Sequence, residues 1–298
     1  MVGSRRRADR TTGEEHVVKV YISVDMEGVA GIATLDQILR GGFGYARAQE
    51  LMTEEANAAI AGAFDGGATE VVVNDSHGTM DNLIHERLDP RARLVFGAPK
   101  AQCMAEGMTA ECVVALFVGY HAPAGAPGVL AHTFSSHFGE VRFNGSPVSE
   151  AEVNALHATS LGIPVGLVSG DDVISTIATE AFPGAEIVTV KTAHGFSAAD
   201  SVSPRVARDL IRESAARATS GATDLTVPSL PSTFTVEVDM PSPLGAELAA
   251  NIPGCSRTGD RTVSADVTGP SEVIGLINVL YELAAASERT RLAVVNRR

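Results

Sequence analysis

Apolar residues form short runs along the first two thirds of the chain, and stretches with helical spacing alternate with these runs. Helices are expected at residues 46–64, 80–88, 150–160, 173–182 and 203–220. Buried strands are expected from the runs VVKVYISVD, TEVVVND, LVFG, CVVALFVGY, VLAHTF, IPVGLVSGDD and AEIVTVK. The alternation predicts an α/β fold, with a three-layer α/β/α domain around a mainly parallel sheet.

The last third of the chain has a different pattern. TVPSLPSTF is a Pro- and Ser-rich boundary, after which FTVEVDM and RTVSADVTG are typical of strands and residues 271–286 of a helix. The predicted organisation is a disordered tail over residues 1–16, a metal-binding catalytic α/β domain over 17–222 and a smaller α+β domain over 223–298. Within the α/β domain, EVRFNG ends in an Asn-Gly turn, which indicates a hairpin.

Composition and charge narrow the classes of protein. The chain has 23 basic and 36 acidic residues and a net charge of −13, which disfavours binding to nucleic acid phosphates. No apolar run approaches the ~20 residues of a membrane helix, and the start of the sequence lacks the apolar segment of a secretory signal. Its three cysteines form no CxxC pair. We therefore expect a cytoplasmic protein that binds neither nucleic acid nor a membrane.

Three of the predicted strands end in side chains of the kind that bind metals. Asp25 and Glu27 follow the first strand, Asp75 and His77 the second, and His121 follows CVVALFVGY. The carboxyl ends of parallel strands meet at one edge of a sheet, so these side chains are expected to converge there. Carboxylates mixed with imidazoles suit Zn²⁺ or Mn²⁺, which favours a metallohydrolase. Asp75 has two alternatives, namely orienting His77 or capping the next helix.

Two further residues have both a structural and a chemical interpretation. His132 lies in the apolar stretch VLAHTF, where it is either a core residue or an acid–base group that faces the metals. Glu150 begins a predicted helix, and the helix dipole is a sufficient reason for a carboxylate at that position. The sequence contains no P-loop motif, no GxSxG elbow and no HExxH helix motif, so the common sites of these three types are excluded.

Several motifs together resemble one known family. SVDMEGVAGI, MTEEAN, VVNDSHG, GYHA, PGVLAH, PVSEAEVNA and VSGDD occur in the order found in zinc-dependent D-aminopeptidases of the bacterial dipeptide-operon (DppA) type. The likeness extends from about residue 17 to about residue 286. It implies two divalent metal ions, zinc in this family, with Asp25 as a bridging ligand. Glu27, His77, His121 and Glu150 match the remaining ligands, His132 matches the catalytic histidine, and Asp75 belongs to the shell outside the ligands.

The same resemblance implies a function and an assembly. Members of the family are hydrolases that release N-terminal D-amino acids from short peptides or amides, and they form ring-shaped homo-oligomers, here expected as a decamer. The residues by themselves leave other classes open. One is another dinuclear amidohydrolase, lactonase or phosphoesterase on the same scaffold; the other is a metal-stabilised oligomeric binding protein. A phosphoesterase would need a cationic clamp, for which the only loose candidates are Arg40, Arg47 and Lys100.

Overall fold

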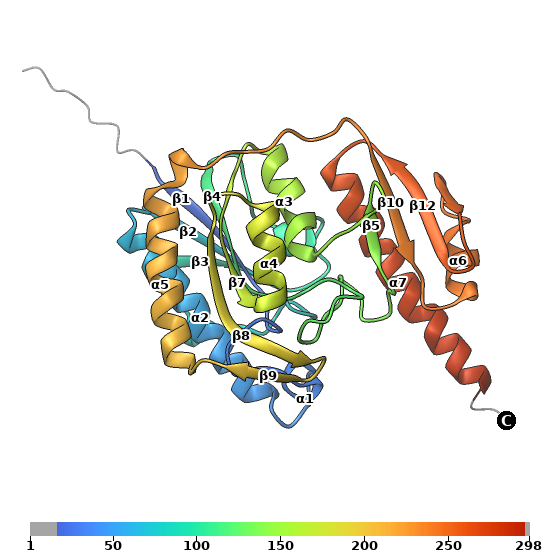
Figure 1. The fold of residues 1–298 in the computed structure, drawn as a ribbon, viewed down its shortest axis with the longest axis horizontal. Coiled ribbons are helices and arrows are strands. Elements are labelled where there is room, and N and C mark those ends of the chain that lie inside the picture. Colours follow the sequence, from blue (N-terminus) through green and yellow to red (C-terminus); the bar gives the residue numbers. More distant parts are fainter. Residues whose placement is uncertain (1–16, 296–298) are drawn as a thin grey trace, which may run out of the picture.

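The large unit of the protein is built on a seven-stranded sheet. The computed structural model describes residues 17–295, and Figure 1 shows the sheet between two layers of helices. Its strand order is β3-β2-β1-β4-β7-β8-β9, and every pairing except β8 with β9 is parallel. The strands are β1 (Lys19–Val24), β2 (Glu70–Asp75), β3 (Ala92–Val95), β4 (Cys112–Tyr120), β7 (Val165–Asp171), β8 (Glu186–Gly195) and β9 (Ala198–Ser201).

Helices cover both faces of this sheet, because alternate strand residues point to opposite sides. Ile22 and its β1 neighbours Val20 and Val24 belong to the apolar cluster of α2 (Tyr45–Asp65) and α5 (Pro204–Ser220). Tyr21 belongs to the cluster on the other face, where α3 and α4 pack (Figure 1). The shorter helices are α1 (Leu35–Ile38), α3 (Glu150–Ser160), α4 (Asp172–Ala181), η1 (His85–Arg87), η2 (Cys103–Ala105) and η3 (Ala222–Asp224). The predicted three-layer α/β/α architecture is confirmed.

The smaller unit is an antiparallel sheet of order β11-β12-β10-β5-β6, covered by two helices. Its elements are β5 (Val141–Phe143), β6 (Ser146–Pro147), β10 (Phe234–Asp239), α6 (Pro243–Ala249), β11 (Cys255–Arg257), β12 (Thr262–Val267) and α7 (Pro270–Val295). The β5–β6 hairpin belongs to the chain between β4 and α3, yet β5 pairs with β10. The sheet therefore joins the segment before α3 to the last third of the chain. The domain boundary at residue 222 stays a prediction.

Most predicted elements agree with the structure, and two do not. A helix over residues 80–88 is expected from the sequence, but only the short η1 forms, and Met80, with a φ of 56°, lies outside any helix. The expected strand VLAHTF is a loop, because Leu130 and Phe134 have φ values of 53° and 58° that interrupt an extended chain. The predicted hairpin is present, with left-handed Asn144 and Gly145 at its turn.

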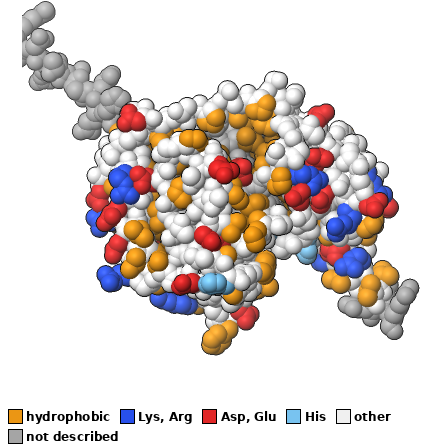
Figure 2. All heavy atoms as spheres, in the orientation of Figure 1, with side chains coloured by type: hydrophobic (Ala, Val, Ile, Leu, Met, Phe, Trp, Pro, Cys, Tyr) orange, Lys and Arg blue, Asp and Glu red, His pale blue; other side chains and the backbone are white. Residues whose placement is uncertain are grey.

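The surface is mixed in character. On the face shown in Figure 2, Lys and Arg side chains are scattered among Asp and Glu side chains rather than gathered in one basic patch. Within residues 17–295, no helix combines the length and the apolarity that crossing a bilayer requires. The predicted tail over residues 1–16 lies outside the described part of the chain.

Candidate metal centre

The predicted ligands meet at the carboxyl edge of the parallel sheet. Asp25 and Glu27 follow β1, His77 follows β2, His121 follows β4, and Glu150 is the first residue of α3. All five side chains are buried. Strand ends and a helix start that are far apart in sequence thus place three carboxylates and two imidazoles in one small volume.

Close contact between the ends of β1 and β4 brings the first ligands together. The Gly28 N–H donates to the Gly119 carbonyl at 2.7 Å, and the Asp25 N–H donates to the Val118 carbonyl at 2.8 Å. A Cβ at Gly28 would lie 2.0 Å from the Tyr120 carbonyl oxygen, so only glycine permits this approach. The turn after β1 therefore runs directly against the segment that ends in His121.

The Asp25 carboxylate lies between the two imidazoles. Its Oδ1 is 3.3 Å from Nδ1 of His77, and its Oδ2 is 3.3 Å from Nε2 of His121. Glu27 Oε2 is 2.9 Å from the same nitrogen of His77, and Glu150 Oε2 is 3.3 Å from the same nitrogen of His121. The nitrogen of each imidazole that faces the carboxylates thus lies near one carboxylate of its own, and Asp25 lies near both of these nitrogens. A carboxylate that bridges two cations requires this arrangement.

Backbone carbonyls fix the orientation of both imidazoles. Nε2 of His77 lies 2.8 Å from the carbonyl of Ile38, and Nδ1 of His121 lies 2.9 Å from the carbonyl of Ala122. A carbonyl can only accept, so each of these nitrogens carries its proton toward the backbone. The nitrogen on the other side of each ring therefore faces the carboxylates, as in histidines that bind a metal.

The electrostatics of the cluster favour a cation. Burial by itself would lower the pKa of His77 and His121, but Glu27, Glu150 and Asp25 outweigh it and raise both values well above the ordinary range. Burial would raise the pKa of Asp25, but the neighbouring imidazoles of His121 and His77 lower it. The same carboxylates that attract protons to the imidazoles would attract a divalent ion between them.

The donor set fits a metal centre. Asp25 Oδ2 and His121 Nε2 are buried polar atoms that have no hydrogen-bond partner within residues 17–295. Ligand atoms of Asp25, Glu27 and His121 all lie within 4.8 Å of one another, and so do those of His121, His132 and Glu150. Both groups contain His121, and the first also contains Asp25, the carboxylate that lies between the two imidazoles. Oxygen and imidazole donors of this kind suit zinc.

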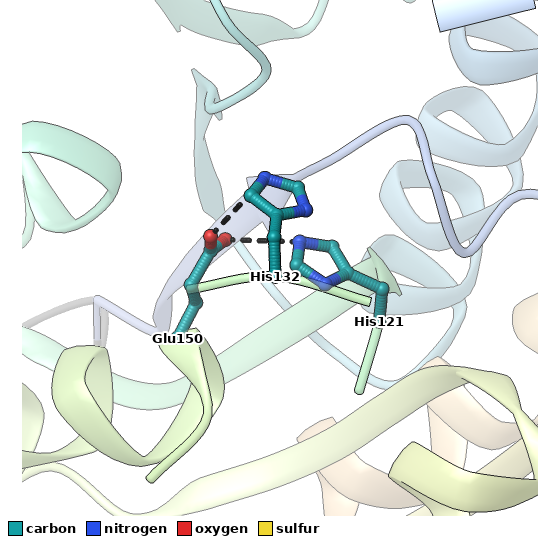
Figure 3. Close-up of side chains that lie close together, drawn as sticks. All are labelled: His121, His132 and Glu150. Atoms are coloured by element: carbon teal, nitrogen blue, oxygen red, sulfur yellow. Dashed lines mark ion pairs between the residues drawn. The ribbon is translucent and has the colours of Figure 1, made fainter. Parts of the chain in front are cut away.

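His132 lies beside this cluster and is more accessible than the five proposed ligands. Its ring stacks on that of His121, with centroids 4.2 Å apart and an interplanar angle of 9°, and Figure 3 shows both rings next to Glu150. Nδ1 of His132 is 2.9 Å from the Leu130 carbonyl, so Nε2 faces Glu150 Oε1 at 3.6 Å. The side chain is 20% exposed. A substrate could therefore reach the free nitrogen.

Glu150 is not needed to cap its own helix. Ser149 and Glu152 form a capping box, in which the Ser149 N–H and hydroxyl donate to the Glu152 carboxylate at 2.8 Å each. Glu150 instead accepts the Phe134 N–H at 2.5 Å and turns its other oxygen toward His121. Burial of this carboxylate is thus not explained by the helix dipole alone.

Asp75 has a supporting position. Its carboxylate accepts hydrogen bonds from the N–H groups of Asn82 and Leu83 at 2.5 and 2.7 Å. Asn82 also donates to the carbonyl of His77 at 2.6 Å, so the two residues hold the loop that carries this histidine. Asp75 therefore lies outside the cluster of proposed ligands.

Sequence reasoning missed two buried charged residues near the site, Lys191 and Glu55. Lys191 donates to three backbone carbonyls of the loop after Glu27, and Glu55 accepts the Ala30 N–H of the same loop at 2.9 Å. The only sequence signal was a lysine inside the apolar strand AEIVTVK. Asp171 caps α4 and also accepts the Val129 N–H at 2.7 Å.

Comparisons with known proteins identify the family of this chain. The family model described as D-aminopeptidase matches residues 18–279. A D-aminopeptidase of Bacillus subtilis (strain 168) is 37% identical over 268 residues, which cover 90% of this chain and 98% of the relative. A solved structure, described as Zn-dependent D-aminopeptidase DppA from Bacillus subtilis, a self-compartmentalizing protease, has a TM-score of 0.87 and 36% identity over 90% of this chain and 98% of that one. On this evidence the chain belongs to the D-aminopeptidase family of peptidases.

Proposed function

We propose that this chain is a zinc-dependent aminopeptidase that releases N-terminal D-amino acids from short peptides or amides. Two zinc ions would be held by Asp25, Glu27, His77, His121 and Glu150. The observation that carries the proposal is the Asp25 carboxylate, which directs one oxygen to each of two oriented imidazoles. The family assignment and the zinc-dependent relative support the choice of metal and of stereochemistry.

The charges of the site suit this occupancy. Asp25, Glu27 and Glu150 supply three negative charges in a buried volume, and two divalent ions would more than compensate them. A bound pair of zinc ions supplies Lewis-acid polarisation of the scissile carbonyl and lowers the pKa of water toward neutrality. The carboxylate oxygens at the same edge could also receive the free α-amine that distinguishes an aminopeptidase substrate.

His132 is the residue that we assign to proton transfer. The Leu130 carbonyl holds the proton on Nδ1, so Nε2 is free to take a proton and return it to the leaving amine. Stacking on His121 keeps the ring at the edge of the cluster, and its partial exposure opens it to substrate. These contacts favour an acid–base role over core packing.

We also propose that the chain assembles into a closed homo-oligomer, with a decamer as the expected size. The similar Bacillus subtilis protein is described as self-compartmentalizing. Large apolar side chains are exposed on this chain, and Phe43 is the most exposed of them, at 101%. Enclosed active sites would restrict the substrates to short peptides.

The phosphoesterase alternative is less well supported, because its candidate cations are occupied. Arg40 pairs with Asp81, Arg47 pairs with Glu50, and Lys100 donates to Asn74 and to the carbonyl of Asp75. A phosphate clamp needs a cation that is free to face the metals. Each of these three side chains is instead engaged by a neighbouring carboxylate, amide or carbonyl group.

The decisive experiment compares D- and L-aminoacyl p-nitroanilides and short peptides as substrates of the zinc-reconstituted protein. We expect hydrolysis of the D-aminoacyl substrates, and no hydrolysis by protein that carries Asp25→Ala. A preparation that holds two zinc ions per chain but leaves every D-aminoacyl substrate intact would contradict the proposal. Hydrolysis of a phosphodiester or lactone by that preparation would favour the alternative on the same scaffold.

A further inference from the structure

Lys191 is a buried lysine on β8 that no proposed step has used. The sequence contains three lysines, and this one is only 3% exposed. Its ammonium group donates to the carbonyl of Glu27, to that of Val29 at 3.0 Å and to that of Ile32 at 2.6 Å. An ammonium group has three N–H donors, so all of them are committed to one loop.

The contacts of Lys191 are not those of an ion pair. Within the described residues, no carboxylate oxygen lies within 4.0 Å of its Nζ. Burial lowers the pKa of Lys191 to about 8, although Glu55, Asp171 and Glu27 raise it in part. An apolar side chain would fill the same space without the cost of burying a charge. Space filling therefore does not explain a lysine at this position.

The loop that Lys191 binds is directly connected to residues of the proposed metal site. It begins directly after Asp25 and Glu27 and leads to Ile38, whose carbonyl orients His77. Glu55 on α2 accepts the Ala30 N–H at 2.9 Å, so a buried carboxyl group holds an N–H group of the loop whose carbonyls Lys191 holds. Lys191 on β8 and Glu55 on α2 thus fix the same loop, the first through backbone carbonyls and the second through a backbone N–H group.

We propose that Lys191 is a positioning residue of the metal centre. By binding three carbonyls of the loop after Glu27, it holds Asp25, Glu27 and, through Ile38, His77 in the arrangement that receives the ions. It does not touch substrate or metal, and it acts through the loop. This inference rests on the proposed dinuclear site, in which the ions share Asp25.

The test measures zinc affinity rather than turnover. Wild-type protein, Lys191→Met and the control Lys19→Met are stripped of metal, and zinc is titrated in competition with a chromophoric chelator. Lys19 lies at the opposite end of the sheet, where it pairs with the exposed Glu111. We expect Lys191→Met to bind zinc about 10–100-fold more weakly at one or both ions, the usual effect of losing a contact that orients a ligand. Lys19→Met should bind as the wild type does.

Circular dichroism and the melting temperature of the zinc-free proteins separate positioning from stability. A purely structural lysine would lower the melting temperature and leave the zinc affinity of folded protein unchanged, and that result would overturn the proposal. If Lys191→Met does not fold, Glu55→Ala decides, because it releases the same loop at Ala30. If folded Glu55→Ala then binds zinc with the affinity of the wild type, zinc binding does not require this loop to be held, and the proposal is contradicted.

The wild-type titration distinguishes this inference from the proposed function. Binding of two zinc ions by the wild type, with equal affinity in folded Lys191→Met, refutes only the role of Lys191. Failure of the wild type to bind two ions refutes the dinuclear site itself, and the positioning role falls with it.

Discussion

The carboxylates of the site differ in which imidazoles they contact, and these contacts indicate a different role for each. Asp25 contacts both imidazoles, whereas Glu27 contacts only His77 and Glu150 contacts His121 and approaches His132. A carboxylate shared by two ions should therefore matter more for metal binding than one that serves a single ion.

We expect Asp25→Ala to lose more metal than Glu27→Ala. Without the shared carboxylate, two divalent cations would repel each other across the site with little screening. Metal analysis of the purified variants after dialysis against zinc measures the difference. The wild type should hold close to two ions per chain, Glu27→Ala at least one and Asp25→Ala the fewest. Equal metal content in the two variants would argue against a bridging role.

His132→Ala should keep both metals and the fold but lower kcat by roughly 10²–10⁴-fold, the usual contribution of a positioned proton-transfer group. The reason is that Nε2 of His132 lies 3.6 Å from Glu150 Oε1 on a side chain that is partly exposed to substrate. Metal content, melting temperature and kcat are measured on one preparation. Turnover close to that of the wild type in a folded, metal-replete variant would falsify the catalytic role.

Glu55 gives the fold a pH dependence of known sign. Burial raises its pKa from 4.5 to about 7, more than the Ala30 hydrogen bond and Lys191 lower it. The folded state thus binds more protons than the unfolded state between these values. This contribution to stability is fully present below the unfolded pKa and is lost as pH rises through about 7.

Glu55→Gln should therefore stabilise the zinc-free protein at alkaline pH only. Glutamine keeps an acceptor for the Ala30 N–H but does not ionise. Urea denaturation should show nearly equal stability of variant and wild type at about pH 5, and a gain of about 1–3 kcal/mol for the variant at about pH 8. If variant and wild type differ in their free energy of unfolding by the same amount at both pH values, Glu55 is not the source of this pH dependence.

At the scale of elements, the site depends on how closely β1 and β4 approach each other. Gly28→Ala would place a Cβ 2.0 Å from the Tyr120 carbonyl oxygen and push the two strand ends apart. We expect a loss of about 1–3 kcal/mol in stability together with weaker zinc binding. Gly275→Ala is the control, because a Cβ at that position of α7 meets nothing within 4 Å. Equal behaviour of the two variants would show that the close approach is unimportant.

The arrangement of strands and helices also explains which site residues could be predicted from the sequence and which could not. Apolar runs that end abruptly in Asp25, His77 and His121 predicted both the parallel sheet and the converging edge. Glu150 entered only through the family resemblance, because a helix start is already a good position for a carboxylate. Lys191 was missed because its partners are backbone carbonyls, which no side-chain pattern displays.

His132 shows a further limit of pattern reading. VLAHTF is apolar enough to indicate a strand, but left-handed Leu130 and Phe134 make it a loop. These conformations are imposed by tertiary contacts, such as the Leu130 N–H with the Phe196 carbonyl at 2.8 Å and the Phe134 N–H with Glu150. Local propensity cannot include partners that lie so far along the chain.

For the whole molecule, we predict a homo-oligomer larger than a dimer. The similar Bacillus subtilis protein is described as self-compartmentalizing, and Phe43 of this chain is fully exposed. Light scattering coupled to size-exclusion chromatography measures the mass directly. A stable monomer at working concentration would end this prediction, and with it the argument that an enclosed chamber selects short peptides.

The β5–β6 hairpin has a consequence for the order of events during synthesis. The last strand of the seven-stranded sheet ends at Ser201, so that sheet can form while the rest of the chain is still being made. β5, a few residues before Glu150, pairs with β6 along one edge, but its other edge has no partner until β10 at Phe234–Asp239 has been made. A nascent chain of intermediate length therefore exposes an unpaired strand edge, which chaperones recognise. We expect zinc capture to be completed only after β10 has emerged from the ribosome.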